Sequence, residues 1–373
     1  MFKKSSISGI TLESAGLVAL ADLPTVAVRT ALMGTASWLD ILVLSPGMHQ
    51  QQSADEVNRS EFPQTGSLTN GYVFRIENPA TVSYLQRIGR TGHLVTAHVE
   101  SNPKPKNPLN NSYFDLSPPQ YHTFWRAGVS VALLYLLCPM LTIVVFALVG
   151  SIRDWWALAV LGMLVLSRTI NVFVIKRRVS DSKDWKGAEE NGSGDLLVVL
   201  SQDRWVRLQG DLSDVKRVTA GQWLRDEDRV ESLAVGFATL LVYAAAALAG
   251  NASTTGSLLI ALLLLCSVAL LALCNSLTHR LQMYDCIVQE DKTLRNPYKR
   301  RLEMVKALVE EMDLNREQEG KRGAWAINMQ LIQQSELDNI PLPESQSTTD
   351  YSKEREPSSG SSSTAPLMCR LGH

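Results

Sequence analysis

Four long apolar runs, separated by polar segments, constrain this 373-residue chain more than any other feature. They cover residues 127–150, 155–175, 233–250 and 257–274. A hydrocarbon core about 30 Å thick needs roughly 17–25 apolar residues at about 1.5 Å rise each, and every run has that length. Most helices of a soluble protein keep a polar face, which all four of these runs lack. The sequence therefore predicts an α-helical polytopic membrane protein.

The spacing of the runs groups them in pairs. Ser151–Asp154 joins the first run to the second, and Asn251–Gly256 joins the third to the fourth. Neither link is long enough to hold a domain. We therefore expect four transmembrane helices arranged as two hairpins, over residues 127–175 and 233–274.

The basic residues predict the orientation. The two short links hold one basic residue, Arg153, whereas residues 176–231 hold eleven. Cytoplasmic loops of membrane proteins carry an excess of Lys and Arg. Both termini and the loop at 176–232 are therefore predicted to be cytoplasmic, in a plasma membrane or an endomembrane.

The region before the first span, residues 1–126, is predicted to be cytosolic. Its apolar stretch at 25–44 is long enough for a fifth span, but Arg29 and Asp40 lie inside it. An interfacial or re-entrant helix pair, divided at Pro24, fits this composition better. The fifth span remains the alternative.

Short strand patterns predict a small β-containing part outside the membrane. Residues 72–76 and 94–99 show them before the first span. In the middle loop, residues 196–200 and 205–208 flank a short polar turn and predict a β-hairpin. Because an isolated hairpin is only marginally stable, we expect it to pack on the N-terminal strands.

The segment after the fourth span, residues 275–340, is predicted to hold cytosolic helices. The fourth helix is expected to continue to Asn296-Pro297. Apolar residues then recur at helical spacing within 298–318, opposite a charged face, and predict an amphipathic helix. A shorter helix is expected from Ala324. Residues 341–373 are rich in Ser, Pro and Thr and are predicted to be disordered.

Four segments resemble a family of uncharacterised fungal multi-pass membrane proteins. They are ESAGLVALADLP at 13–24, GTASWLDILVL at 34–44, YKRRLEMV at 298–305 and AWAINM at 324–329. The resemblance covers most of the chain up to about residue 335. It implies a eukaryotic host and no known activity.

Arg168 and Asn171 form the candidate intramembrane polar site. They lie one helical turn apart within the second run. An arginine near the bilayer centre costs about 2.5–3.5 kcal/mol on insertion scales. It can snorkel to the cytoplasmic side, pair with a carbonyl or a loop, or line a substrate path. Snorkelling is the expectation, and it predicts that Arg168→Lys is tolerated, because lysine also reaches the interface.

Two basic clusters are candidate lipid-surface contacts. The residues are Lys176, Arg177, Arg178, Lys299, Arg300 and Arg301. The first three directly follow the second span, and the others open the amphipathic helix. Bases near an anionic leaflet are attracted to it. The alternative is that the clusters only fix the topology and begin a soluble helix.

No constellation in the sequence specifies a reaction. There is no HExxH, GxSxG or phosphate-binding glycine loop, and the cysteines are scattered. Catalytic, cofactor and metal sites are therefore not predicted. A net charge of −1 excludes a strongly basic nucleic-acid binder. Asn251 opens the one N-glycosylation sequon that faces outward, and it lies beside the membrane.

These features favour a non-enzymatic membrane protein whose cytosolic parts bind a protein partner, a second copy or lipid. The alternative is a transporter or channel subunit that uses Arg168 and Asn171. A membrane enzyme is a third and weaker hypothesis, because nothing in the sequence marks a catalytic pocket.

Overall fold

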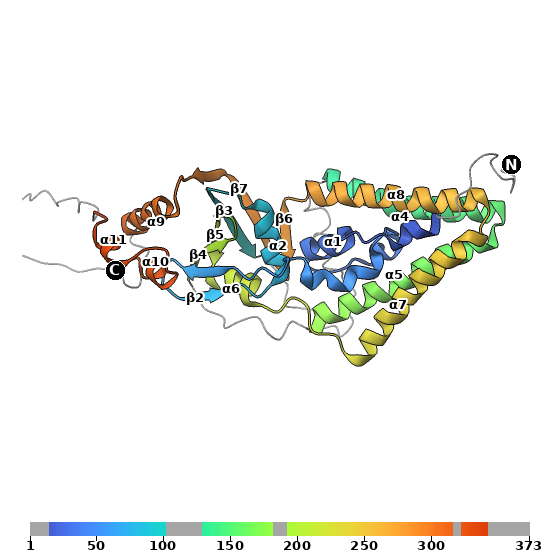
Figure 1. The fold of residues 1–373 in the computed structure, drawn as a ribbon, viewed down its shortest axis with the longest axis horizontal. Helices are drawn as coiled ribbons and strands as arrows, with labels where there is room; N and C mark the ends of the chain where they lie inside the picture. The colour runs from blue at the N-terminus through green and yellow to red at the C-terminus, as the bar shows by residue number, and fades with distance from the viewer. Residues whose placement is uncertain (1–14, 102–128, 182–191, 316–321, 342–373) are drawn as a thin grey trace, which may run out of the picture.

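The computed structural model describes residues 15–101, 129–181, 192–315 and 322–341. A bundle of long helices and a seven-stranded sheet lie end to end (Figure 1), so the molecule is elongated. Below, the end of the bundle next to the sheet is called the sheet end. The opposite end, where the short connections lie, is called the link end.

Four helices are long and apolar enough to cross a membrane. They are α4 (Val129–Ile152), α5 (Trp155–Asp181), α7 (Arg229–Leu248) and α8 (Thr254–Leu277). Large apolar side chains such as Met140, Phe173, Leu240 and Leu262 are exposed on their outer faces. A soluble protein rarely exposes such a surface, so the prediction of four helices of spanning length is confirmed.

The four helices pack as two pairs. α4 packs along α8, and α5 packs along α7, so each packed pair takes one helix from each predicted hairpin. The two pairs meet at the link end and separate towards the sheet (Figure 1). Asp154 joins the two connections, because its Oδ2 accepts hydrogen bonds from Ser253 N at 2.7 Å and from Ser253 Oγ at 2.5 Å.

The N-terminal segment fills the space between the two pairs. Its elements are η1 (Ala15–Leu20), α1 (Thr25–Met33), η2 (Trp38–Leu42) and η3 (Met48–Glu56). η1 packs on η5 (Ala249–Asn251), which is part of the connection between α7 and α8. α1 then runs along α8 to β6, at the sheet end.

The chain next turns back into the bundle and out again. Thr142 Oγ1, near the middle of α4, donates to Leu42 O at 2.7 Å. η3 returns along α5 to the sheet end, where Arg178 contacts Asp55. Residues 34–56 therefore form a re-entrant loop, and residues 15–33 cross most of the bundle.

This path bears on the alternative of a fifth span. Residues 25–44 do not form one continuous span, because the chain reverses at Gly34 (φ 67°). A Cβ at Gly34 would lie 2.4 Å from Gln282 O, so only glycine fits the turn. The first described element, η1, lies at the link end, and the last, α11 (Gln334–Asp338), lies beyond the sheet (Figure 1). The two termini themselves lie outside the described residues, so their cytoplasmic orientation stays a prediction.

The sheet has the strand order β2-β1-β4-β5-β3-β7-β6. The strands are β1 (Gln64–Ser67), β2 (Val73–Arg75), β3 (His93–Ser101), β4 (Ser193–Leu200), β5 (Arg204–Asp211), β6 (Arg280–Met283) and β7 (Cys286–Pro297). All neighbours are antiparallel except β3 and β5. The middle loop and the N-terminal region thus build one sheet.

The predicted β-hairpin of the middle loop is confirmed as β4 and β5. Its turn places Gln202 at φ 63° and Asp203 at φ 50°. Two consecutive residues with positive φ are typical of the tight turns that match strand twist. The predicted packing on the N-terminal strands is also confirmed, since β1 pairs with β4 and β3 with β5.

The expectation that α8 continues as a helix to residue 296 is wrong. α8 ends at Leu277, and β6 and β7 follow as an antiparallel hairpin. Tyr284 takes a positive φ of 54° in the turn between them. β7 pairs with β3, so the ladder provided by a strand distant in sequence decides the conformation of this segment.

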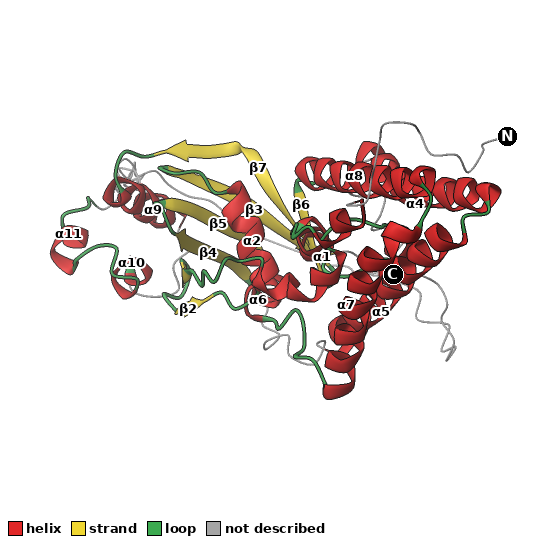
Figure 2. Cartoon of the chain, turned by 45° about the vertical axis from the view of Figure 1, so that its right-hand side comes forward, coloured by secondary structure: helices red, strands yellow, loops and turns green. Residues whose placement is uncertain are grey.

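Helices cover both faces of the sheet (Figure 2). α2 (Pro79–Ile88) and α6 (Leu212–Ala220) pack on one face. α9 (Arg301–Asn315), α10 (Ala324–Asn328) and α11 pack on the other. The apolar stripe predicted within 298–318 therefore lies buried against strands β3, β4 and β5. It is not available to a membrane surface.

An ion pair holds α9 to the sheet. Arg207 Nε donates to Asp195 Oδ1 at 2.9 Å, and Arg207 Nη1 donates to Glu311 Oε1 of α9 at 2.7 Å. Arg207 and Asp195 are both buried. Burial alone would lower the pKa of Arg207, but the hydrogen bonds and charges of Asp195 and Glu311 outweigh it and raise that pKa.

We expect Arg207→Met to destabilise the protein by about 3–5 kcal/mol, because it leaves the Asp195 carboxylate buried without its cation. Thermal unfolding of the purified full-length protein measures the loss. The matched control is Arg301→Met, which removes an exposed ion pair with Asp203 and should cost less than about 1 kcal/mol. Equal losses of stability for the two variants would contradict the conclusion that the buried Arg207–Asp195 pair holds α9 to the sheet.

Candidate functional site in the helix bundle

Polar side chains of the N-terminal segment meet polar side chains of the long helices inside the bundle. The set is Arg29, Thr30, Asp40, Gln51, Gln52, Tyr135, Arg168, Asn171 and Arg178, all of them buried. Burial removes such groups from water, so each needs a hydrogen-bond partner within the protein. We call this set the bundle network.

Arg168 lies at the centre of the bundle network and is only 2% exposed. Its Nε donates to the backbone oxygen of Asp40 at 2.9 Å, and its Nη1 donates to Gln51 Oε1 at 2.6 Å. Gln51 Nε2 in turn donates to Thr30 Oγ1 at 3.1 Å. Arg168 therefore points inward to a carbonyl and an amide and does not snorkel to the sheet end.

The carboxylate nearest to Arg168 belongs to Asp40. Its Oδ2 accepts a hydrogen bond from Ser37 N at 2.7 Å and so caps η2, and its Oδ1 accepts one from the hydroxyl of Tyr135. The guanidinium of Arg29 lies 5.3 Å from the centre of the Tyr135 ring, an arrangement typical of a cation–π contact. One buried acid thus lies among two buried cations.

Asn171 belongs to the same bundle network. Gln52 Nε2 donates to the Asn171 backbone oxygen at 3.1 Å and to Asn171 Oδ1 at 3.2 Å. Asn171 Nδ2 donates to Ser167 O at 3.1 Å. Arg168 and Asn171 therefore hold two consecutive glutamines of η3. The sequence places these two helix residues one turn apart, but it does not identify their partners.

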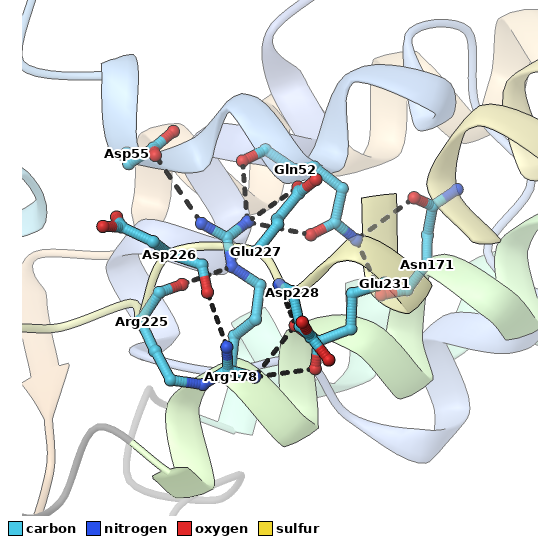
Figure 3. Close-up of polar contacts among 9 residues, drawn as sticks. All are labelled: Gln52, Asp55, Asn171, Arg178, Arg225, Asp226, Glu227, Asp228 and Glu231. Carbon is cyan, nitrogen blue, oxygen red and sulfur yellow. Dashed lines mark hydrogen bonds and ion pairs between the residues drawn. The ribbon is translucent and has the colours of Figure 1, made fainter. Parts of the chain in front are cut away.

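Arg178 connects the bundle network to the sheet end (Figure 3). Its Nη1 donates to Gln52 Oε1 at 3.1 Å and to Glu227 Oε1 at 3.2 Å, and its Nε donates to Arg225 O at 2.7 Å. Asp55 Oδ2 lies 3.7 Å from its Nη2. One buried guanidinium therefore joins η3, α5 and the segment that leads into α7.

The neighbours of Arg178 also bind protein groups. Lys176 Nζ donates to Ala36 O at 3.1 Å and lies 4.8 Å from the centre of the Trp38 ring. Arg177, 49% exposed, lies 3.2 Å from Glu231. Lys176 and Arg178 thus hold the N-terminal segment in place, and a lipid contact of residues 176–178 stays a prediction.

The second basic cluster lies at the start of α9, on the part of the sheet domain farther from the bundle (Figure 1). Arg301 pairs there with Asp203 in the β4–β5 turn. Lys299 and Arg300 precede a helix whose apolar stripe is buried. Lipid-surface docking of 298–318 requires an exposed apolar face on this helix, and the apolar face of α9 is buried against the sheet.

Asn251 lies exposed at the link end, at the end of η5. The hydroxyl of Ser253, the third residue of the sequon, accepts a hydrogen bond from Gly256 N at 3.1 Å and caps α8. N-glycosylation of Asn251 stays a prediction.

Most partners in the bundle network were not predicted from the sequence. In the sequence, Arg29 and Asp40 count only against a fifth span, and no predicted site includes the glutamines of η3. A signal was present, because charged residues inside an apolar stretch need internal partners. Their identity depends on contacts between residues more than one hundred positions apart.

The bundle network is suited to a structural role, because its hydrogen bonds join the N-terminal segment to the long helices. In the described ranges, no group of three His, Cys, Asp or Glu residues could hold a metal ion. The hydrogen-bonding groups of Arg168 and Asn171 described above are all directed at the protein itself. The arrangement fixes the N-terminal segment between the helix pairs.

We expect Arg178→Gln to destabilise the protein by about 2–3 kcal/mol, because several charge-assisted hydrogen bonds are lost. The control is Arg177→Gln, the adjacent and half-exposed arginine, which should cost about 0–1 kcal/mol. Both are measured as shifts in thermal unfolding of the full-length protein in detergent. An Arg177 variant that is as destabilised as the Arg178 variant would show that burial is not the cause.

Comparisons with family models, curated proteins and solved structures find no match to this chain. The resemblance to fungal membrane proteins therefore stays a prediction.

Proposed function

We propose that this protein is a non-enzymatic, multi-pass membrane protein that holds its sheet domain in a fixed position at the membrane surface, where the domain binds a protein partner. The observation that carries the proposal is the tight joint between bundle and sheet. α8 ends at Leu277 and β6 begins at Arg280, so only two residues separate a long apolar helix from the sheet. A connection this short fixes the position and orientation of the sheet relative to α8.

Further contacts support the fixed joint. Trp223, in the segment between α6 and α7, donates from Nε1 to Gly34 O at 2.8 Å. Gly34 in turn packs on the backbone of Gln282 in β6. The Arg178 contacts add a second connection, at the ends of α5 and α7. A domain that only needed a flexible tether would not require these contacts.

An exposed aromatic edge supports a protein partner. Tyr72, next to edge strand β2, is 66% exposed and stacks on Phe74 with ring centres 5.9 Å apart. Phe62, just before β1, is 52% exposed. Aromatic side chains are enriched at protein–protein interfaces. We take this edge, Phe62 and Tyr72 to Phe74, as the binding surface.

Transport through the bundle, with Arg168 and Asn171 on the path, is the alternative. The internal partners of these two residues count against it, because a substrate would have to displace the N-terminal segment to reach them. The burial of two polar residues, Arg168 and Asn171, within an apolar bundle is the feature that favours it.

A photo-crosslinker placed at Tyr72 in the full-length protein tests the partner function in intact cells. We expect a crosslink to one defined protein. The same crosslinker at Leu240, on the outer face of α7, should give lipid adducts instead. Absence of a protein crosslink at Tyr72, together with selective solute flux in reconstituted vesicles, would replace this function with transport.

The orientation is part of the proposal. The excess of basic residues at 176–231 favours a cytoplasmic sheet domain, and the two links then face the opposite side. Because η1 lies at the link end, residue 15 is placed on the side away from the sheet. We expect a membrane-impermeant maleimide to label Ser151→Cys, but not Thr293→Cys, in intact cells of a Cys369→Ser background. Labelling at Thr293→Cys alone would reverse the orientation.

A further inference from the structure

The sheet end of α8 lies at the depth where lipid headgroups begin, if the bundle spans a bilayer as proposed. α8 has 24 residues and is therefore about 36 Å long, slightly more than a hydrocarbon core of about 30 Å. Its last turn, Cys274–Leu277, thus lies at the boundary of the core. Leu273 and Leu277 are exposed there and continue the apolar outer face of the helix.

Arg87 approaches this boundary from the sheet domain. It lies in the last turn of α2, is exposed, and its Nη2 donates to the backbone oxygen of Asn275. Cations are favourable beside the carbonyls at a helix C-terminus. Arg87 is therefore held at the end of α8 by a contact that leaves other guanidinium N–H groups for a ligand.

Two more basic residues lie beside Arg87. The hydroxyl of Tyr84 donates to His279 O at 2.9 Å, so α2 is fixed next to His279 and Arg280. His279 is exposed, and Arg280 is partly exposed. We call Arg87, His279 and Arg280 the basic patch. Its members come from segments about 190 residues apart, so no sequence cluster indicates it.

Glu290, an acidic residue beside Tyr84, is engaged elsewhere. Glu290 N donates to the Tyr84 hydroxyl, which places this residue close by, but its carboxylate pairs with Arg295 at 2.6 Å. Arg87 has no ion pair with any of the residues that the structure describes. Partial desolvation lowers the pKa of Arg87 from its ordinary value, yet a guanidinium keeps its proton at neutral pH.

We propose that the basic patch of Arg87, His279 and Arg280 binds the phosphate of an anionic phospholipid headgroup in the leaflet next to the sheet. This inference rests on the proposed membrane insertion. Arginine binds phosphate through paired N–H groups, and the exposed leucines of α8 continue the contact along the acyl chain. Lipid binding would thus occur at the joint between bundle and sheet.

Native mass spectrometry of the full-length protein, titrated with phosphatidylglycerol, tests the proposal. We expect Arg87→Gln to weaken phosphatidylglycerol binding about five-fold, the contribution of roughly one base at an anionic surface. Binding of phosphatidylcholine should not change. The control Arg301→Gln, at the start of α9, should leave phosphatidylglycerol binding unaffected. His279→Gln should also weaken phosphatidylglycerol binding. Because His279 is exposed, this variant still tests the proposal if the Arg87 variant does not fold.

The other outcomes are distinct. Inorganic phosphate competing as well as the lipid would make this a free-anion site and overturn the lipid assignment. Equal phosphatidylglycerol affinity for the wild type, Arg87→Gln and His279→Gln would overturn it as well. Carbonate extraction of the wild-type protein tests membrane insertion separately, because release from the membrane would refute the proposed function, whereas retention with unchanged lipid affinity would refute only the patch.

Discussion

Arg168→Lys should abolish accumulation of the folded protein, with a loss of stability of about 6 kcal/mol or more. An ammonium group cannot replace a guanidinium that donates simultaneously to Asp40 O and Gln51 Oε1 in fixed directions. Each polar group left unsatisfied in a bilayer core costs several kcal/mol. Fluorescence-detected size-exclusion chromatography of the full-length protein measures the folded fraction.

The control for this prediction is Arg177→Lys, nine residues further along the same helix and half-exposed, which should leave the folded fraction unchanged. Snorkelling predicts instead that Arg168→Lys is tolerated. A monodisperse, correctly inserted Arg168→Lys protein would therefore show that the hydrogen bonds to η2 and η3 are not needed to hold the N-terminal segment.

Gly47→Val should be the most damaging single change outside the bundle network. Gly47 has φ 78°, and a Cβ there would lie 2.1 Å from the backbone oxygen of Leu23. Two passes of the N-terminal segment cross at this point, so neither backbone can move without leaving its place between the helices. A β-branched residue adds backbone strain to the overlap, and we expect a loss of more than about 4 kcal/mol.

Gly162→Ala provides the matched control, because nothing lies within 4 Å of a Cβ at this position of α5. It should be neutral or stabilise the helix by about 0.5–1 kcal/mol. Thermal unfolding in detergent compares the two variants. If Gly47→Val retained the wild-type unfolding temperature, the close crossing of residues 23 and 47 would have to be wrong.

Elements that depend on local pattern can be predicted from the sequence alone. The four apolar helices lie where the runs of suitable length and composition occur, because the solvent they face imposes that composition along each helix. The hairpin of β4 and β5 follows from two apolar strands around a turn that tolerates positive φ. In each case the deciding residues are neighbours in the chain.

The tertiary structure decided everything that depends on distant partners. Residues 280–297 form strands because β3 offers a ladder to β7, although their sequence was compatible with a helix. The apolar stripe of α9 fits a membrane surface and a sheet equally well, and the presence of β3, β4 and β5 decides for the sheet. Arg168 has its partners 128 and 117 positions away. The charged and polar residues of that segment would, from its local sequence, be expected at the surface. A local pattern reports which solvent or surface a residue prefers, but only the folded chain determines which group lies opposite it.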